Sequence, residues 1–364
     1  MRTRTHALLL ALTLAAGCGA RTGLRVPDAS LDAPEEDVFV RFDACVAGRF
    51  RMIRRSARLL FVIDRSGSMN EPLVMGSETS RWEATVGVLR ETLPRFEERL
   101  EMGALIFPRT PDGDTTLRYL QYCQVQPGAG ITVDVAPSNA EAVNQMLAQT
   151  FTQGATPTGA AVRRATDWLR AHDARGAAQY IVLLTDGIPN CNSEIVPAEC
   201  ECLDPAGMCS GARGRLSCLD ADGTVSAISA ARGAGIVTYV IGIDGSIEAR
   251  YQSVLDRMAE AGGRPNAGTP RYNSIRDRAQ LQATFEGIQR TVALCSYVTP
   301  SRPDAPDAID VDLDGVRVPR DPTRREGWDW SDREYGELTF YGRACDGAQR
   351  LSARVDATVR CAAR

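Results

Sequence analysis

The sequence has no lysine, since all 42 of its basic side chains are arginine. This composition is typical of a GC-rich genome, and it excludes a lysine Schiff base or a lysine general base. Histidine is nearly absent too: His6 lies in the first residues and His172 late in a predicted helix with a polar end. Nothing places either histidine beside a nucleophile, which argues against a Ser-His-Asp arrangement. With no basic stripe and a formal charge of −4, nucleic acid is not an expected partner.

The sequence also lacks an apolar run long enough to span a bilayer as a helix. Its most apolar stretch, residues 7–16, follows two arginines and ends at Gly17-Cys18, the pattern of a secretory signal. The ending "LAAGC" resembles the lipobox of bacterial lipoproteins, although Ala15 stands where leucine is preferred. The resemblance implies a signal peptide over 1–17 and lipidation of Cys18, and glycine at position 19 favours the outer membrane. Ordinary cleavage nearby, with loss of Cys18, is the alternative.

Residues 18–44 contain prolines and a surplus of acidic residues but little apolar periodicity. Such a composition is typical of a flexible tether. Its reach as a coil is roughly 30 Å, from 5–6 Å times the square root of its length. We therefore expect an exported lipoprotein that faces the periplasm or the surface and touches the membrane only through its lipid anchor.

Export determines how the cysteines are interpreted. Without Cys18, ten of the eleven cysteines remain, and an even number in an oxidising compartment predicts disulfides. Zinc is the competing explanation for "CEC", but no paired C-x₂-C pattern is present. The disulfide candidates are Cys45, Cys123, Cys191, Cys200, Cys202, Cys209, Cys218, Cys295, Cys345 and Cys361.

The middle of the chain alternates between strand and helix patterns. Continuous apolar runs predict buried strands, and apolar residues at steps of three and four predict helices between them. Such alternation is typical of a doubly wound α/β domain with a mostly parallel sheet flanked by helices. The predicted strands are 59–63, 102–107, 131–135 (an edge strand), 180–187 and 236–243, and the predicted helices are 82–100, 139–150, 158–171, 247–261 and 276–294.

Oxygen-bearing side chains follow two of these strands. Asp64 comes directly after the first strand, in "DRSGS" with Ser66 and Ser68, and Asp186 follows the strand "YIVLLT". The loop "GATPTGAA" opens a helix between them and carries Thr156. Ligands of such domains bind beyond the carboxyl ends of the strands. We therefore expect these side chains to meet at one edge of the sheet.

Together the three segments resemble the von Willebrand factor A (vWA) domain and its metal-ion-dependent adhesion site (MIDAS). The resemblance covers roughly residues 56–295. It implies that Ser66, Ser68 and Thr156 contact a divalent cation directly, and that Asp64 and Asp186 act through direct or water-bridged contacts. Mg²⁺ prefers such oxygen ligands, although Mn²⁺ and Ca²⁺ stay open.

The family's metal site leaves one coordination position for a partner's carboxylate. We considered helix or turn capping for the serines and a simple turn at Asp186-Gly187, which would leave no metal site. A phosphoryl-transfer aspartate is disfavoured, because position 66 is serine and lysine is absent.

Two regions depart from the simplest family pattern. Residues 188–223 form an insertion with five cysteines, which we expect to rim the metal site or to act as a structural cap. Residues 296–364 predict a small C-terminal antiparallel β module, with a hairpin over 309–318 around Asp314-Gly315. Trp328 and Trp330 are expected in its core. The predicted domains are thus 45–295, with its insert, and 296–364.

The cysteine pairing follows from parity and position. An odd number of cysteines in the insert requires one partner outside it, and Cys123 is the candidate. Cys45 and Cys295 flank the vWA domain and are expected to pair, which leaves Cys345 with Cys361.

The sequence thus predicts a non-enzymatic adhesion or scaffold module of the cell envelope. It would bind a protein ligand with an exposed acidic residue through the metal. The alternative is a structural, disulfide-stapled envelope lipoprotein whose metal site is vestigial or purely stabilising.

Overall fold

The computed structural model describes residues 44–54, 57–111, 121–172, 177–192, 195, 200–203, 206–207, 209, 214–243, 249–333, 336–350 and 352–362. The predicted signal peptide, Cys18 and the tether up to residue 43 lie outside these residues. Within the described part of the chain, no helix combines the length and the apolar character needed to cross a membrane.

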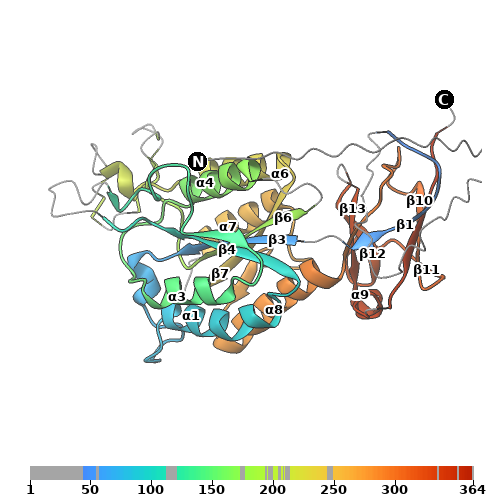
Figure 1. Cartoon of the computed structure of the whole chain (residues 1–364). Helices are drawn as coiled ribbons and strands as arrows, with labels where there is room; N and C mark the ends of the chain where they lie inside the picture. The colour runs from blue at the N-terminus through green and yellow to red at the C-terminus, as the bar shows by residue number, and fades with distance from the viewer. Residues whose placement is uncertain are drawn as a thin grey trace, which may run out of the picture. The chain divides into compact units, whose positions relative to one another are not determined.

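A six-stranded sheet forms the centre of the larger domain, with the strand order β5-β4-β3-β6-β7-β8 (Figure 1). Every neighbouring pair is parallel except β4 and β5, which are antiparallel. The predicted doubly wound α/β architecture is confirmed. The strands are β3 (Ala57–Asp64), β4 (Leu100–Phe107), β5 (Val133–Ala136), β6 (Ala178–Thr185), β7 (Ile236–Ile243) and β8 (Asn273–Ile275).

Both faces of this sheet are buried. All eight residues of β3 are buried, and successive side chains point to opposite faces. Leu59 and Phe61 therefore join one hydrophobic cluster, whereas Leu60 and Val62 join the other. This two-sided burial explains why the strand reads as a continuous apolar run rather than an alternating one.

Helices cover each face of the sheet. The first cluster includes residues of α1, α3 and α8, which lie on one side of the sheet in Figure 1, and the second includes residues of α4, α6 and α7. The helices are α1 (Arg81–Thr92), α3 (Ala140–Ala148), α4 (Thr158–Ala171), α6 (Ala221–Gly233), α7 (Ala249–Gly262) and α8 (Arg278–Leu294).

Three elements differ from the prediction. The first helix was expected to reach residue 100, but α1 ends at Thr92 and Leu93–Arg95 forms a 3₁₀ turn. Pro94 explains this end, because a proline has no backbone N–H to donate the next hydrogen bond of the helix. Helix α6 was not predicted, since its buried side chains include two alanines and a threonine, which weaken the apolar pattern. Strand β8 has only three residues and was also missed.

Two antiparallel four-stranded sheets form the rest of the described chain, in the orders β1-β14-β10-β11 and β12-β13-β9-β2. Strands β1 and β2 precede the parallel sheet in sequence, and their pairing with the C-terminal strands was not predicted. The strands are β1 (Gly48–Arg51), β2 (Ile53–Arg54), β9 (Ser296–Val298), β10 (Ile309–Leu313), β11 (Val316–Val318), β12 (Gly327–Asp332), β13 (Glu337–Tyr341) and β14 (Val355–Val359), and the helix α9 spans Gly342–Ala348.

The predicted hairpin is confirmed. β10 and β11 pair in antiparallel register, and Asp314 and Gly315 join them with φ angles of 51° and 81°. Two positive φ angles are what a two-residue type I′ turn requires. The expectation that Trp328 and Trp330 are core residues is also confirmed, since their exposed fractions are 2% and 6%.

The ten cysteines within the described residues form five disulfides, as expected from their even number. One of them, Cys123–Cys191, joins the insert to the segment after β4, as predicted. Zinc thiolates are thereby excluded for Cys200, Cys209 and Cys218, whose sulfur atoms lie close together but belong to disulfides. The pairs are Cys45–Cys361, Cys123–Cys191, Cys200–Cys218, Cys202–Cys209 and Cys295–Cys345.

The predicted pairs Cys45–Cys295 and Cys345–Cys361 are wrong. β1 pairs with β14, with Gly48 opposite Val359, so Cys45 before β1 meets Cys361 after β14. β9 begins directly after Cys295 and pairs with β13, which runs into α9 and Cys345. The disulfides therefore follow the antiparallel pairing of the C-terminal sheets.

Candidate metal centre

The five predicted ligands lie on three loops at the carboxyl edge of the parallel sheet. Asp64 is the last residue of β3, and Ser66 and Ser68 follow it, Ser68 in the 3₁₀ turn Gly67–Asn70. Asp186 follows the last residue of β6. β3 and β6 are parallel neighbours, so their carboxyl ends lie side by side. Thr156 lies in the loop that leads into α4.

Asp64 is fully buried and accepts two hydrogen bonds. The backbone N–H of Ser66 donates to Oδ1 at 2.8 Å, and the hydroxyl of Thr185 donates to Oδ2 at 2.6 Å. The first bond shapes the turn after β3, and the second ties β3 to β6. Both fix the orientation of the carboxylate at the end of its strand.

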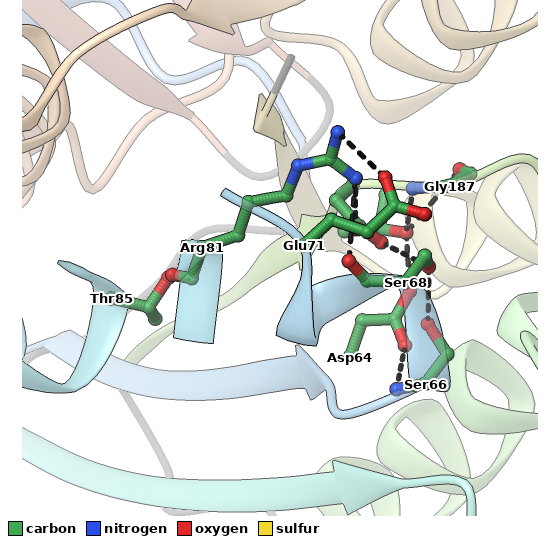
Figure 2. A network of polar contacts seen from close by, with 9 residues as sticks. Asp64, Ser66, Ser68, Glu71, Arg81, Thr85 and Gly187 are labelled. Atoms are coloured by element: carbon green, nitrogen blue, oxygen red, sulfur yellow. Dashed lines mark hydrogen bonds and ion pairs between the residues drawn. The ribbon is translucent and has the colours of Figure 1, made fainter. Parts of the chain in front are cut away.

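A chain of hydroxyl and carboxylate oxygens continues from this turn to β6 (Figure 2). The Oγ atoms of Ser66 and Ser68 are 3.1 Å apart. The Ser68 hydroxyl donates to Asp186 Oδ1 at 2.9 Å. The structure therefore connects four of the five predicted residues by side-chain or backbone hydrogen bonds.

Thr156 reaches the same place from the other loop. Its backbone N–H donates to Asn190 Oδ1 at 2.8 Å, and the Asn190 N–H donates to the Thr156 carbonyl at 2.9 Å. A methyl group placed on Gly187 would lie 3.5 Å from Thr156 Oγ1 and 3.8 Å from Ser68 Oγ. The two hydroxyls thus lie close to one small space beside Gly187, which a side chain at that position would fill.

Arg81, the first residue of α1, also belongs to the site and was missed in the sequence. Its Nη1 donates to Asp186 Oδ2 at 2.6 Å, and its Nη2 lies 3.2 Å from Glu71 Oε2 (Figure 2). The Arg81 side chain is 8% exposed and that of Asp186 is fully buried, so this is a buried ion pair. Each Asp186 oxygen therefore already accepts one hydrogen bond.

The two carboxyl groups differ in their electrostatic surroundings. Burial and, after it, the nearby Asp186 raise the pKa of Asp64 to about 7, although hydrogen bonds from Thr185 and Ser66 oppose the shift. Burial also raises the pKa of Asp186, but hydrogen bonding and charge attraction from Arg81 oppose the rise. Of these two carboxyl groups, Asp186 has a compensating cation in Arg81, whereas Asp64 has none among the described residues.

The sequence does contain a local signal for the position of Arg81. "SRWE" contains a capping box in which the Ser80 hydroxyl accepts from the Glu83 N–H and the Glu83 carboxylate accepts from Ser80. That motif fixes Arg81 as the first residue of the helix. Its contact with Asp186 spans 105 residues of sequence, however, and no local pattern predicts it.

The beginning of the cysteine-rich insert adjoins the site. Asn190 holds the backbone of Thr156, and the next residue, Cys191, is bonded to Cys123. The N–H of Asp220 donates to the Pro189 carbonyl at 2.8 Å, so the end of the insert returns to its start. These described parts of the insert therefore lie beside the loop that carries Thr156.

The residues present fit a divalent metal ion in their donor chemistry. They are two carboxylates and three hydroxyls, the oxygen ligands that Mg²⁺, Mn²⁺ and Ca²⁺ prefer. Four of them are buried, with exposed fractions of 0% for Asp64, 2% for Ser66 and 5% for Thr156 and Asp186. Arg81 is the feature that does not belong to a simple ligand set.

Comparison with known families agrees with the fold. Residues 59–188 match the model of the von Willebrand factor type A domain. The matched range begins in β3 and ends just after Asp186, so it includes all three loops of the site. The chain thus contains a vWA domain, and the mostly parallel sheet flanked by helices is its fold. Among curated proteins, no sequence matches the chain.

Several solved structures are similar to the chain at low sequence identity. An aerotolerance-related membrane protein from Bacteroides fragilis is 18% identical, with a TM-score of 0.37 over 63% of this chain and 98% of its own. The pilus adhesin SpaC from Lactobacillus rhamnosus GG is 15% identical, with a TM-score of 0.45 over 84% of this chain but only 39% of its own. The vWF domain of the type V pili tip protein Mfa5 from Porphyromonas gingivalis is 11% identical, with a TM-score of 0.44 over 65% and 95%.

Proposed function

We propose that this protein is a non-enzymatic adhesion or scaffold module of the cell envelope. It would bind an acidic side chain of a protein partner through a divalent cation held by Asp64, Ser66, Ser68, Thr156 and Asp186. The observation that carries the proposal is the convergence of these five residues, from three separate loops, at the carboxyl edge of the vWA sheet.

The chemistry of the residues supports this function. Ser66, Ser68 and Thr156 would hold the ion through neutral hydroxyls, and Asp64 and Asp186 would contribute charge directly or through water. With few anionic ligands, a bound Mg²⁺, Mn²⁺ or Ca²⁺ supplies an electrophilic position that favours a further carboxylate. The small space beside Gly187 would admit the ion, because glycine leaves it free of side-chain atoms.

A non-enzymatic role is supported by the surroundings of His172, the histidine within the described residues. It lies at the C-terminal end of α4, whereas Thr156 precedes the N-terminal end of the same helix. The His172 ring stacks on Trp168 with 4.2 Å between the centroids, and its Nδ1 lies 2.9 Å from the Trp168 carbonyl. A general base at the metal centre would have to come from another residue type.

A second candidate function is a structural envelope protein whose metal site is vestigial or purely stabilising. Arg81 favours this alternative, because its guanidinium already compensates Asp186 without a metal ion. The two functions differ in one observable: only the adhesion module needs the ion in order to hold a partner.

Calorimetry and partner capture test the proposal together. Mg²⁺ or Mn²⁺ should give heat and raise the melting temperature of the metal-free protein, in proportion to the logarithm of free ion over its dissociation constant. Thr156→Ala and Ser68→Ala should weaken this binding by about tenfold or more, since even outer-shell partners are worth about 10–100-fold. Thr150→Ala, which removes a hydroxyl that donates to the Met146 carbonyl of α3, is the matched control.

For the partner, the immobilised protein is exposed to an envelope extract with Mn²⁺ and after removal of metal by a chelating resin. The adhesion proposal expects a partner that is retained only with metal and is lost with Thr156→Ala. Metal binding without any metal-dependent partner would favour the structural function. If the folded wild-type protein shows neither heat nor a thermal shift, the metal site does not exist.

We also propose that the module is anchored by a lipid on Cys18, with residues 18–44 as its tether. The support is the sequence "LAAGC" alone. Mass spectrometry should find a diacylglyceryl or triacylglyceryl cysteine at the mature N-terminus, and Cys18→Ser should release or mislocalise the protein. An unmodified N-terminus beyond residue 18 would contradict the anchor.

A further inference from the structure

A cavity of about 880 Å³ lies where the loop between α7 and β8, one face of α8 and the loop between β11 and β12 meet. Its lining residues include Gly263, Thr291 and Pro322, one from each of these segments. Helix α7 runs back along the parallel sheet, so the loop after it lies at the edge where β8 begins. The metal-site loops lie at the opposite edge, where the strands end.

Arginine dominates the charge of this cavity. Its lining includes one acidic residue, Glu260, and five arginines: Arg232, Arg264, Arg271, Arg324 and Arg325. Arg271 is paired with Glu260 at 3.3 Å and Arg324 with Asp329 at 3.3 Å. The side chains of the cavity therefore carry an excess of positive charge that their own carboxylates do not balance.

Arg264 is the buried member of these five arginines, and its charge is only partly compensated. Arg264 is 8% exposed. None of its three guanidinium nitrogens makes a hydrogen bond of acceptable geometry to an acceptor among the described residues. The nearest carboxylate oxygen, Glu337 Oε1, lies 3.5 Å from Nη2. That oxygen already accepts from the Tyr180 hydroxyl at 2.6 Å and the Ser331 hydroxyl at 2.8 Å.

A buried guanidinium that lacks acceptors is costly in free energy. The ring of Tyr239, whose centroid lies 5.7 Å from Arg264 Cζ, offsets part of this cost. The planar fork of five N–H donors matches the geometry of carboxylate and phosphate groups. An oxyanion in the cavity would provide the missing acceptors.

We propose that this cavity is a binding site for a small polyvalent oxyanion, a compound that carries carboxylate or phosphate groups. Arg264 holds one anionic group in the interior, and Arg271, Arg324 and Arg325 receive the others at the mouth. Arg264 and Arg271 belong to the vWA fold, whereas Arg324 and Arg325 belong to the loop before β12. The bound anion therefore also ties this loop to the parallel-sheet domain.

Citrate and inorganic phosphate are the probes, and they distinguish carboxylate from phosphate as the preferred group. Titration calorimetry and thermal unfolding are done on protein freed of metal by a chelating resin, because soluble chelators are themselves polycarboxylates. We expect millimolar citrate or phosphate to give heat and to raise the melting temperature of the wild-type protein by mass action. Arg264→Gln should weaken the binding by about tenfold or more, the value of one charge-assisted hydrogen bond.

Arg325→Ala is the second variant, in case Arg264→Gln does not fold. Arg325 is exposed, so its removal should leave the fold intact while it weakens anion binding several-fold. Arg163→Ala, on the exposed face of α4, removes the same charge elsewhere and should change nothing. The proposal is overturned if the wild-type protein binds neither probe, or if Arg264→Gln and Arg325→Ala bind both probes as the wild type does.

Discussion

The two edges of the parallel sheet bury opposite charges that the described residues compensate only in part. At the edge where the strands end, Asp64 is fully buried, and its pKa is raised to about 7 by burial and by Asp186. At the edge where β8 begins, Arg264 is buried, and its guanidinium has no hydrogen-bond acceptor in the part of the chain that the structure describes. In both places the free-energy cost comes from burying a charge, and only the sign of that charge differs. One edge therefore favours a cation and the other an anion.

The edges differ in how far the protein compensates its own charge. Asp186 has Arg81 at 2.6 Å, and Arg81 in turn has Glu71 at 3.2 Å, so an ion-pair network extends from the acidic edge. Arg264 has one carboxylate at 3.5 Å, and that carboxylate is shared with two hydroxyl donors. A buried charge that is only partly matched indicates a ligand site more strongly than the number of charges does.

The largest effect on stability is expected from two separate variants, each of which lacks the disulfide at one edge. Cys123–Cys191 closes 68 residues beside the metal loops. Cys295–Cys345 closes 50 residues beside the cavity, one turn beyond Thr291 and four residues beyond Tyr341. From loop closure, each double serine variant should lose about 4 kcal/mol of stability in chemical denaturation.

Ligand responses then separate the two disulfide variants. The variant without Cys123 and Cys191 should lose affinity for Mn²⁺ but keep its affinity for citrate, and the variant without Cys295 and Cys345 should do the reverse. Distant sites usually contribute additively within about 0.5 kcal/mol. If either variant lost affinity for both Mn²⁺ and citrate, the two edges would be energetically coupled.

Asp186→Ala should be the next largest effect. From the sequence alone, Asp64 and Asp186 are expected to repel each other, so that the substitution would leave the metal-free protein as stable as before or slightly more so. Arg81 reverses this expectation, because its buried guanidinium would lose its closest partner and keep the exposed Glu71 and the Ser68 carbonyl, which lies 3.4 Å from Nη1. We expect a loss of about 3 kcal/mol in metal-free buffer, the low end for breaking a buried ion pair.

Asp64→Asn is the matched control for this prediction. No arginine contacts Asp64 among the described residues, where its hydrogen-bond donors are the Ser66 N–H and the Thr185 hydroxyl. Removal of its charge should therefore leave the metal-free protein as stable as the wild type or more so, while metal binding is lost. If urea denaturation shows Asp186→Ala to be as stable as Asp64→Asn, the Arg81 ion pair carries no stability.

How much of this could be predicted from the sequence depends on the range of the interaction. β3, β6 and β7 were found because strands buried on both faces read as continuous apolar runs. The five candidate ligands were found because each lies in a short motif directly after a strand or before a helix. The fold then brings these motifs together, since parallel neighbours end at the same edge.

The parts that sequence could not predict depend on distant partners. The Arg81–Asp186 pair spans 105 residues, and the β1–β14 pairing that joins Cys45 to Cys361 spans more than 300. The arginines of the cavity come from the segments 232–271 and 324–325, without a shared motif. In an arginine-rich sequence without lysine, their number alone carries no signal.

The smallest expected change in stability comes from Gly187→Ala, which tests the acidic edge without removing a charge. The added methyl group would lie at ordinary contact distances, 3.5 Å from Thr156 Oγ1 and 3.8 Å from Ser68 Oγ. Gly187 is not among the residues with positive φ, so alanine can adopt its backbone conformation. Stability should stay the same or rise by less than about 1 kcal/mol, because alanine restricts the unfolded chain. Mn²⁺ affinity should fall nonetheless, since the methyl group takes the space between the two hydroxyls.

Gly233→Ala, where no atom lies within 4 Å of the added group, is the control and should leave Mn²⁺ affinity unchanged. Calorimetry of both variants would distinguish the cases: an unaltered Mn²⁺ affinity in Gly187→Ala would mean that Thr156 and Ser68 do not share a metal ion. The compensation of Asp186 by Arg81 would then be the whole function of the acidic edge, and only the arginine-lined cavity would remain as a site for a ligand.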